Sequence, residues 1–198
     1  MPTYTFSDDD TLNANKEKGE RLYRSLTQEK IPTGRNMGNV KQRNSFLRVY
    51  RLYLNLHVEF HSGDSIVDGH KVSIENYRTA VAQGLHGQPY HNLPDLKELF
   101  TGFVSEEANE LLKRGKNPVN EHVYPRNRTL RLDLLEPIVP LSFKEFIYHY
   151  ASKGGVFSKT TPEENRIVRA FHKQNPNALE ELSWREIYSK CHIYEASN

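Results

Sequence analysis

Cysteine is almost absent from this chain of 198 residues, which contains only Cys191. A single thiol excludes an intramolecular disulfide and a zinc site built from thiolates, because both need at least two cysteines. His192 follows directly, but neighbouring residues on a helix point in different directions. We therefore do not expect a catalytic Cys–His pair.

Long hydrophobic runs are also missing. No window approaches the run of about 20 apolar residues that a membrane span requires. The first ten residues, MPTYTFSDDD, lack the basic and apolar regions of a secretory signal. We expect a cytoplasmic protein that does not associate with membranes.

Several catalytic signatures are absent. The segment GRNMGN, residues 34–39, has two glycines but no following Lys-Ser/Thr and no preceding strand, so it is not a phosphate-binding loop. Serine hydrolase signatures do not occur. The triplet Asp95-Leu96-Lys97 resembles the acid-x-lysine element of one large nuclease class, but we expect this segment, DLKELF, to be a short helix.

The patterns that are present predict mostly helices. Apolar residues at spacings of three and four predict a long amphipathic helix over residues 40–61, although LNLHVEFH at its end also alternates like a strand. A modest helix is expected at residues 20–29 and a hairpin at residues 63–72. Further helices are expected after a Ser or Thr that caps each of them, namely Ser73, Ser105, Ser142, Thr161 and Ser183.

These elements predict an α+β fold: a mainly helical single domain with a small β-sheet or hairpin that carries the segment Glu-His-Val-Tyr-Pro, residues 121–125. Residues 155–160, GVFSKT, are a further candidate strand. We expect an N-terminal arm or helix over residues 1–35 and a main domain over residues 36–198. Within the main domain, residues 105–198 form the module that carries the motif.

The net charge is only +2, but the cations are clustered. Residues 34–58 contain five basic residues and no acid, and residues 111–132 contain six basic residues and one acid. Clustered cations favour a partner rich in phosphate, because binding releases condensed counterions. The candidates for contacts to nucleic acid are Arg35, Lys41, Arg43, Lys116, Arg126, Arg128 and Arg131.

One stretch inside the second window carries chemistry. Phosphodiester cleavage needs a general base to activate the nucleophile and often a divalent ion to neutralise the phosphate. Glu121 and His122 are residues of the right types for these tasks. On a regular strand they point to opposite faces, so the pair requires either a distortion or two separate roles.

The string E-H-V-Y-P resembles the first element of the HNH, or beta-beta-alpha metal, nucleases. The resemblance implies that His122 is the general base and that Glu121 is a ligand of Mg²⁺ or another divalent metal. An Asn and a helical His complete the family's pattern, and here Asn165 and His172 are the candidates. They lie seven residues apart on a predicted helix and so share a face.

The chain departs from the HNH pattern in two ways. About forty residues separate Glu121 from Asn165, where the family has a short hairpin, and the cysteine pairs of many members are absent. The run from residue 105 to residue 193 also resembles small uncharacterised phage and bacterial proteins, a likeness that implies a coherent C-terminal module and no activity. The structural alternative is that His122 is a half-buried strand histidine bonded to backbone and that Glu121 is exposed and pairs with one of the arginines.

Three functional hypotheses follow. The first is a metal-dependent DNA endonuclease of phage or restriction type. The second is a non-catalytic nucleic-acid-binding or phage regulatory protein, and the third is a protein-interaction module with acidic and basic faces. The expected partner is DNA, and a homodimer is an open alternative to a monomer.

Overall fold

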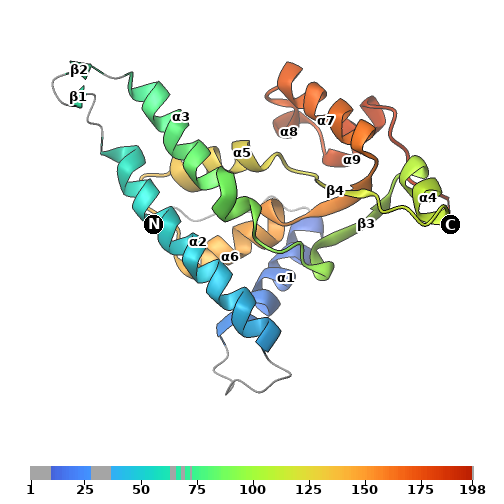
Figure 1. Ribbon diagram of the computed structural model, residues 1–198, viewed down its shortest axis with the longest axis horizontal. Helices are drawn as coiled ribbons and strands as arrows, with labels where there is room; N and C mark the ends of the chain where they lie inside the picture. The colour runs from blue at the N-terminus through green and yellow to red at the C-terminus, as the bar shows by residue number, and fades with distance from the viewer. Residues whose placement is uncertain (1–9, 28–36, 63–65, 68–69, 72, 198) are drawn as a thin grey trace. The chain divides into compact units, whose positions relative to one another are not determined.

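Helices make up most of the computed structural model, which describes residues 10–27, 37–62, 66–67, 70–71 and 73–197. The helices are α1 (Asp10–Thr27), α2 (Met37–His61), α3 (Ile74–Leu85), α4 (Glu106–Lys113), α5 (Arg126–Thr129), α6 (Phe143–His149), α7 (Pro162–Gln174), α8 (Ala178–Glu181) and α9 (Trp184–Lys190) (Figure 1). Shorter helical turns cover His86–Tyr90, Lys97–Leu99, Leu130–Leu135 and Tyr150–Gly154. The predicted class, a mainly helical α+β fold, is confirmed.

Five helices begin at the residues that the sequence predicts. The hydroxyls of Ser73, Ser105, Ser142, Thr161 and Ser183 each accept a hydrogen bond from a backbone N–H of the first turn. In α6, α7 and α9 a glutamate in the first turn also bonds back to the cap residue and completes a capping box. Local capping therefore fixes the start of these five helices.

The chain divides into two compact units. The first comprises the described residues of Met1–Pro94 together with Arg126–Gly155, and the second comprises Asp95–Pro125 and the described residues of Val156–Asn198. The predicted boundary between residues 35 and 36 falls within residues 28–36, outside the described residues. The predicted module at residues 105–198 is split between the two units, because residues 126–155 belong to the first.

The first unit is held together by an aromatic core under α2. The predicted helix over residues 40–61 is confirmed, and α2 lies beside α3 (Figure 1). Phe46 and Tyr53 of α2 are fully buried against rings of α6 and its extension, with Phe46–Tyr150 centroids 4.9 Å apart and Tyr53–Phe146 centroids 5.6 Å apart. Helix α1 covers α6, and the expected hairpin is formed by β1 (Ile66–Val67) and β2 (His70–Lys71).

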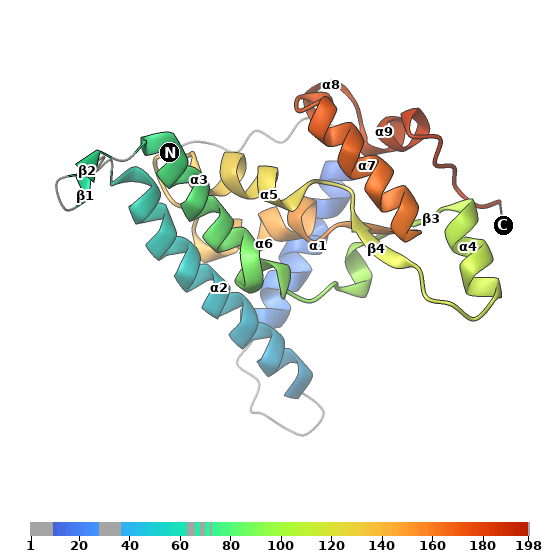
Figure 2. The ribbon, with the colours of Figure 1, turned by 45° about the horizontal axis from the view of Figure 1, so that its top comes forward.

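The second unit is built on a three-stranded sheet in the order β3-β5-β4. Strand β5 (Phe157–Thr160) lies in the centre, parallel to β3 (Phe100–Val104) and antiparallel to β4 (Val119–His122). Helix α7 lies alongside β4 (Figure 2). The second unit has one apolar core, to which β3, the residues just after β4 and just before β5, and helices α7, α8 and α9 contribute. This core includes Phe103, Val168, Trp184, Ile187 and Tyr188.

The segment at residues 95–100 differs from its prediction. We expected a helix over DLKELF, but only the turn Lys97–Leu99 is helical, and β3 begins at Phe100. The residues from Phe100 to Val104 are rich in aromatic and β-branched side chains, which suit a strand. Strand β5 supplies the partner that makes the strand stable, and this long-range pairing cannot be read from local spacing.

Candidate active site

The motif lies on β4, and its two central residues face opposite sides of the sheet. Glu121 pairs with Ser158 and His122 with Phe157 in a regular antiparallel register from Val119 to His122. Because successive side chains on a strand alternate between faces, Glu121 and His122 do not converge. The sequence left open a distorted strand or a regular strand, and the structure shows the regular strand, in which Glu121 and His122 have separate environments.

On one face, His122 forms a hydrogen-bonded pair with Asp95. Its Nε2 lies 3.0 Å from Asp95 Oδ1, and Asn120 Nδ2 donates to Asp95 Oδ2 at 3.1 Å. The His122 side chain is 16% exposed and that of Asp95 30%, so the pair is sheltered but reachable from solvent. A carboxylate that accepts from Nε2–H leaves Nδ1 as the basic nitrogen. The arrangement therefore orients an imidazole for proton transfer.

The same face carries a row of rings and one cation. Phe157 lies between Phe100 and His122, with ring centroids 5.5 Å and 6.5 Å away respectively. Lys159 is the direct cross-strand partner of Asn120, so the two side chains share this face. Its Nζ lies 5.7 Å from the centroid of the Phe100 ring. Asp95, Asn120, His122 and Lys159 thus form a polar cluster beside an aromatic surface.

On the other face, Glu121 is buried among residues of α7. It is 7% exposed, and burial raises its pKa from 4.5 to about 7. The Arg169 guanidinium and a hydrogen bond from the Asn165 amide oppose this rise, but they do not cancel it. Arg169 and Asn165 thus offset only part of the cost of removing the Glu121 carboxylate from water, and the neutral acid is favoured.

Asn165, which donates to Glu121, is itself only partly satisfied. Its buried Oδ1 has no hydrogen-bond donor among the residues that the structure describes. A buried acceptor without a donor costs about 1–3 kcal/mol, so this contact between β4 and α7 carries a local penalty.

The predicted metal ligands are only partly brought together. Glu121 and Asn165 do meet, but as a hydrogen-bonded pair beside Arg169, an arrangement that does not fit a cation. His172 lies two turns further along α7, with its ring 6.1 Å from that of Phe171. Within the described residues, no three Asp, Glu, His or Cys side chains converge as metal ligands would. On the His122 face, Asp95 places a carboxylate beside the imidazole.

The predicted phosphate contacts fall into different environments. Arg35 lies outside the described residues. Lys41 of α2 is exposed, Arg43 is half-buried, and Lys116, just after α4, is exposed. Two cations that were not singled out, Arg48 and Arg51, are also exposed on α2.

The arginines that follow the motif belong to the first unit, and Arg126 and Arg131 have structural partners. Arg126 is buried, and its guanidinium donates to the carbonyls of Gly154 at 2.7 Å and His91 at 3.3 Å. Arg131 forms ion pairs with Glu75 at 2.5 Å and with Glu136 at 3.1 Å. Arg128 lies in α5. The expectation that Arg126 reaches phosphate fails, because backbone carbonyls hold its charge in the interior.

Helix α2 nevertheless presents a continuous cationic strip. Lys41, Arg48 and Arg51 lie at helical spacing on one exposed face, together with Asn44 and Asn55. None of the three cations forms an ion pair with a residue that the structure describes. At 1.5 Å of rise per residue, the three cations span roughly 15 Å along the helix, enough to follow several phosphates of a strand.

Sequence reasoning set Asp95 aside with the acid-x-lysine triplet and missed Lys159. Asp95 stands 27 residues before His122, and the helix expected over residues 95–100 concealed its place at the entrance to β3. The alternation of Phe157, Ser158 and Lys159 on the predicted strand was the one available signal for Lys159. Its alignment with Asn120 depends on the register between β4 and β5, which the sequence does not reveal.

Among the helices of the described residues, none combines the length and the apolar character that crossing a bilayer needs. No protein-family model matches the chain, and no curated protein or solved structure does so either.

Proposed function

We propose that the protein is an endonuclease in which His122 is the general base and Asp95 orients it. The observation that carries the proposal is the pair itself: a histidine held by a carboxylate at 3.0 Å, with an amide and an ammonium group on the same face of the sheet. A histidine in this setting suits proton transfer near neutral pH. Glu121 belongs to the interior in this proposal and has no part in the chemistry.

The step follows from the positions of the side chains. Nδ1 of His122 would take the proton from the attacking water, or from a ribose hydroxyl in RNA, as the oxygen of that group bonds to phosphorus. The bond from phosphorus to the leaving oxygen would break, and that oxygen would take a proton from solvent. Asp95 would stabilise the imidazolium that forms, as a buried carboxylate does in other histidine-dependent hydrolases. Lys159 and Asn120 would donate to the non-bridging phosphate oxygens, where negative charge increases in the transition state.

The proposal includes a divalent cation that is held by a single protein carboxylate. Mg²⁺ keeps several waters and often contacts only one or two carboxylates together with substrate phosphates. Asp95 would hold such an ion on the His122 face, since its carboxylate lies beside the imidazole and is 30% exposed. The ion would supply neutralisation of the phosphate charge.

The test is cleavage of labelled single-stranded and double-stranded DNA and RNA, with Mg²⁺, with Mn²⁺ and with a chelator. His122→Ala is expected to lower the rate by about 10²–10⁴-fold, the usual contribution of a general base. His172→Ala is the matched control, because it removes the other predicted histidine and should cut normally. Equal cleavage by wild type and His122→Ala, or loss of cleavage in His172→Ala alone, would refute the proposed site.

A second candidate is a non-catalytic nucleic-acid-binding protein, and the cationic strip on α2 favours it. Phosphate contacts from exposed helical cations bind nucleic acid without sequence information and depend strongly on salt. This candidate predicts no cleavage under any condition, with binding that weakens steeply as salt rises. Arg48→Ala combined with Arg51→Ala should then reduce binding, whereas His122→Ala should not.

A further inference from the structure

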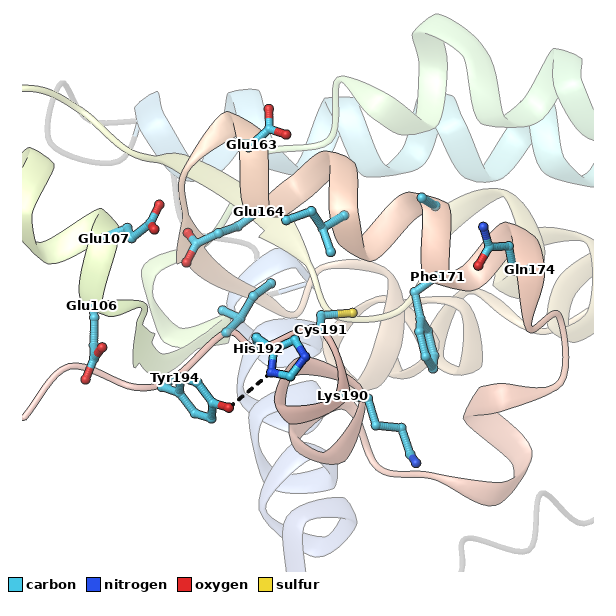
Figure 3. Close-up of a pocket in the computed structure, with 13 residues that line it drawn as sticks. Glu106, Glu107, Glu163, Glu164, Phe171, Gln174, Lys190, Cys191, His192 and Tyr194 are labelled. Carbon is cyan, nitrogen blue, oxygen red and sulfur yellow. Dashed lines mark hydrogen bonds between the residues drawn. The ribbon is translucent and has the colours of Figure 1, made fainter.

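A groove in the second unit lies away from the His122 site. It has a volume of about 580 Å³ and is lined by the first turns of α4 and α7, the exposed side of α7 and the segment Lys190–Tyr194 (Figure 3). This volume lies within the range of known ligand sites. None of the four residues of the polar cluster, Asp95, Asn120, His122 and Lys159, lines it.

The floor of the groove is apolar and partly exposed. Ile167 and Phe171 of α7 and Ile193 contribute to it, and Ile167 is 43% exposed. Tyr194 stands at one side and is 52% exposed (Figure 3). Contact with an apolar group would remove these surfaces from water, which is favourable. The floor therefore suits an apolar side chain.

The wall on the α4 side is acidic. Glu106 and Glu107 are exposed in the first turn of α4, and Figure 3 shows both on the side of the groove that holds Tyr194. Neither forms an ion pair with a described residue, whereas Glu163 pairs with Arg166. The start of a helix stabilises such carboxylates, but it leaves their outward oxygens available to a cation.

The deeper wall is rigid. The buried Glu164 carboxylate accepts from the Ser105 hydroxyl at 2.7 Å and from the Thr161 backbone N–H at 2.7 Å, so it joins the starts of α4 and α7. The backbone N–H of Glu106 donates to the carbonyl of Tyr194 at 3.0 Å and fixes the opposite side. The acidic wall and the apolar floor are thus held in a defined relation before anything binds.

We propose that this groove is a docking site for a short segment of a partner protein in which lysine or arginine side chains alternate with apolar ones. The cations would contact Glu106 and Glu107, and the apolar side chains would cover Ile167 and Phe171. Charge complementarity selects this occupant on the α4 side, because the unpaired carboxylates of Glu106 and Glu107 would repel an acidic segment. The exposed cation Lys190 lines the groove at the end away from these two carboxylates (Figure 3). The proposal goes beyond the endonuclease and does not depend on it.

The test uses a fluorescein-labelled hexapeptide of alternating leucine and lysine, with Leu-Glu and Ser-Lys hexapeptides as matched probes, and measures binding by anisotropy. Saturable binding of the Leu-Lys peptide alone is expected. Glu106→Gln combined with Glu107→Gln should weaken it by about threefold to tenfold, the value of exposed charge pairs. Ile167→Ser should weaken it as well, while the control pair Glu17→Gln and Glu98→Gln, two exposed glutamates outside the groove, should bind normally.

Cys191 locates the bound peptide. It lines the groove, is buried and is the only cysteine of the chain, so alkylation by iodoacetamide reports on opening of the structure at this place alone. The Leu-Lys peptide is expected to slow alkylation of wild type but not of the Glu106/Glu107 variant, with thermal unfolding used to verify that each variant is folded. No saturable binding up to the solubility limit, equal binding by groove and control variants, or an unchanged alkylation rate would overturn the proposal.

Discussion

Asp95 and His122 lie 27 residues apart in the chain, yet Oδ1 of the first is 3.0 Å from Nε2 of the second. Asp95 precedes β3 and His122 ends β4, so the sheet of the second unit brings them together. Asn120, two residues before His122 on the same face, bonds the other oxygen of the carboxylate. The histidine is therefore held by a carboxylate that is itself fixed from a second side.

Asp95→Asn tests whether this pair acts as a unit. The amide is close in shape to the carboxylate, but it cannot stabilise a charged imidazolium in the same way. We expect kcat to fall by about 10²-fold or more, within the usual contribution of acid–base catalysis, while the affinity for nucleic acid stays the same.

The kinetic separation of kcat from binding is the decisive measurement for Asp95. Glu98→Gln, an exposed substitution three residues away, is the control and should alter neither quantity. A variant Asp95→Asn with full kcat would show that the carboxylate only packs against His122. A parallel loss of affinity would instead place Asp95 in substrate binding.

The local elements of this fold follow closely from the sequence, and its site does not. Each cap residue and its glutamate lie within one turn of a helix, so the starts of α6, α7 and α9 are readable from four consecutive residues. The Glu121–Asn165 contact was also anticipated as a pairing of positions. Its chemistry was not, because the burial of Glu121 and the nearness of Arg169 depend on how α7 packs on β4.

The arginines also show that tertiary packing decides the environment of a residue whose type the sequence gives. A run of cations in the sequence predicts charge but not exposure. Arg126 is buried, and its guanidinium donates to backbone carbonyls that lie 28 and 35 residues away in the chain. Arg48 and Arg51, by contrast, are exposed because they lie opposite the apolar stripe of α2 that includes Phe46, Val49 and Tyr53. For a regular amphipathic helix, spacing alone identifies the solvent face.

Glu121→Gln is expected to change how stability depends on pH. The pKa of Glu121 is about 7 in the folded chain against 4.5 ordinarily, so as pH rises the unfolded chain releases this proton at a lower pH than the folded chain does. The stabilisation that protonated Glu121 gives to the folded state is fully present below pH 4.5 and is lost as pH rises through 7. The loss amounts to about 3 kcal/mol in the free energy of unfolding.

The measurement is denaturant unfolding of wild type and Glu121→Gln at several pH values from 4 to 8, an interval that spans both pKa values. The free-energy difference between the two proteins should shift in favour of the glutamine variant across this interval. Glu98→Gln, which removes an exposed acid, should give a curve parallel to that of wild type. Parallel curves for Glu121→Gln would contradict the raised pKa.

Arg126 and the α2 cations should separate stability from nucleic-acid binding. Arg126→Met leaves the Gly154 and His91 carbonyls without their charged donor and should lower the free energy of unfolding by about 1.5–3 kcal/mol. Arg48→Ala with Arg51→Ala should leave stability nearly unchanged. The same pair should reduce the slope of log K against log salt by about 2, since each phosphate contact contributes about 0.9.

The two variants serve as controls for each other in unfolding and in DNA-binding titrations at several salt concentrations. If Arg126→Met lowers the salt slope while its stability is unchanged, the interior role of Arg126 is wrong. If the Arg48/Arg51 variant keeps the wild-type slope, the exposed face of α2 does not contact phosphate.

Gly154→Ala should be among the most destabilising single-methyl additions in the first unit. A Cβ at Gly154 would overlap the hydroxyl of Tyr90 and come within 2.9 Å of the ring carbon that bears it. Tyr90 is fully buried, with its ring 6.0 Å from that of Tyr150, so it cannot move aside freely. We expect a loss of about 1–3 kcal/mol in the free energy of unfolding, the usual cost of overpacking.

Gly84→Ala is the matched control, because the nearest atom to its Cβ would be Leu56 Cδ1 at 4.0 Å, an ordinary contact. In helix α3 this change should stabilise the protein by about 0.5–1 kcal/mol. Tyr90→Phe removes the hydroxyl that overlaps the new methyl group, so the cost of Gly154→Ala should be smaller in that background. An equal cost in both backgrounds, measured by urea unfolding, would show that the methyl group is resisted by something other than the Tyr90 hydroxyl.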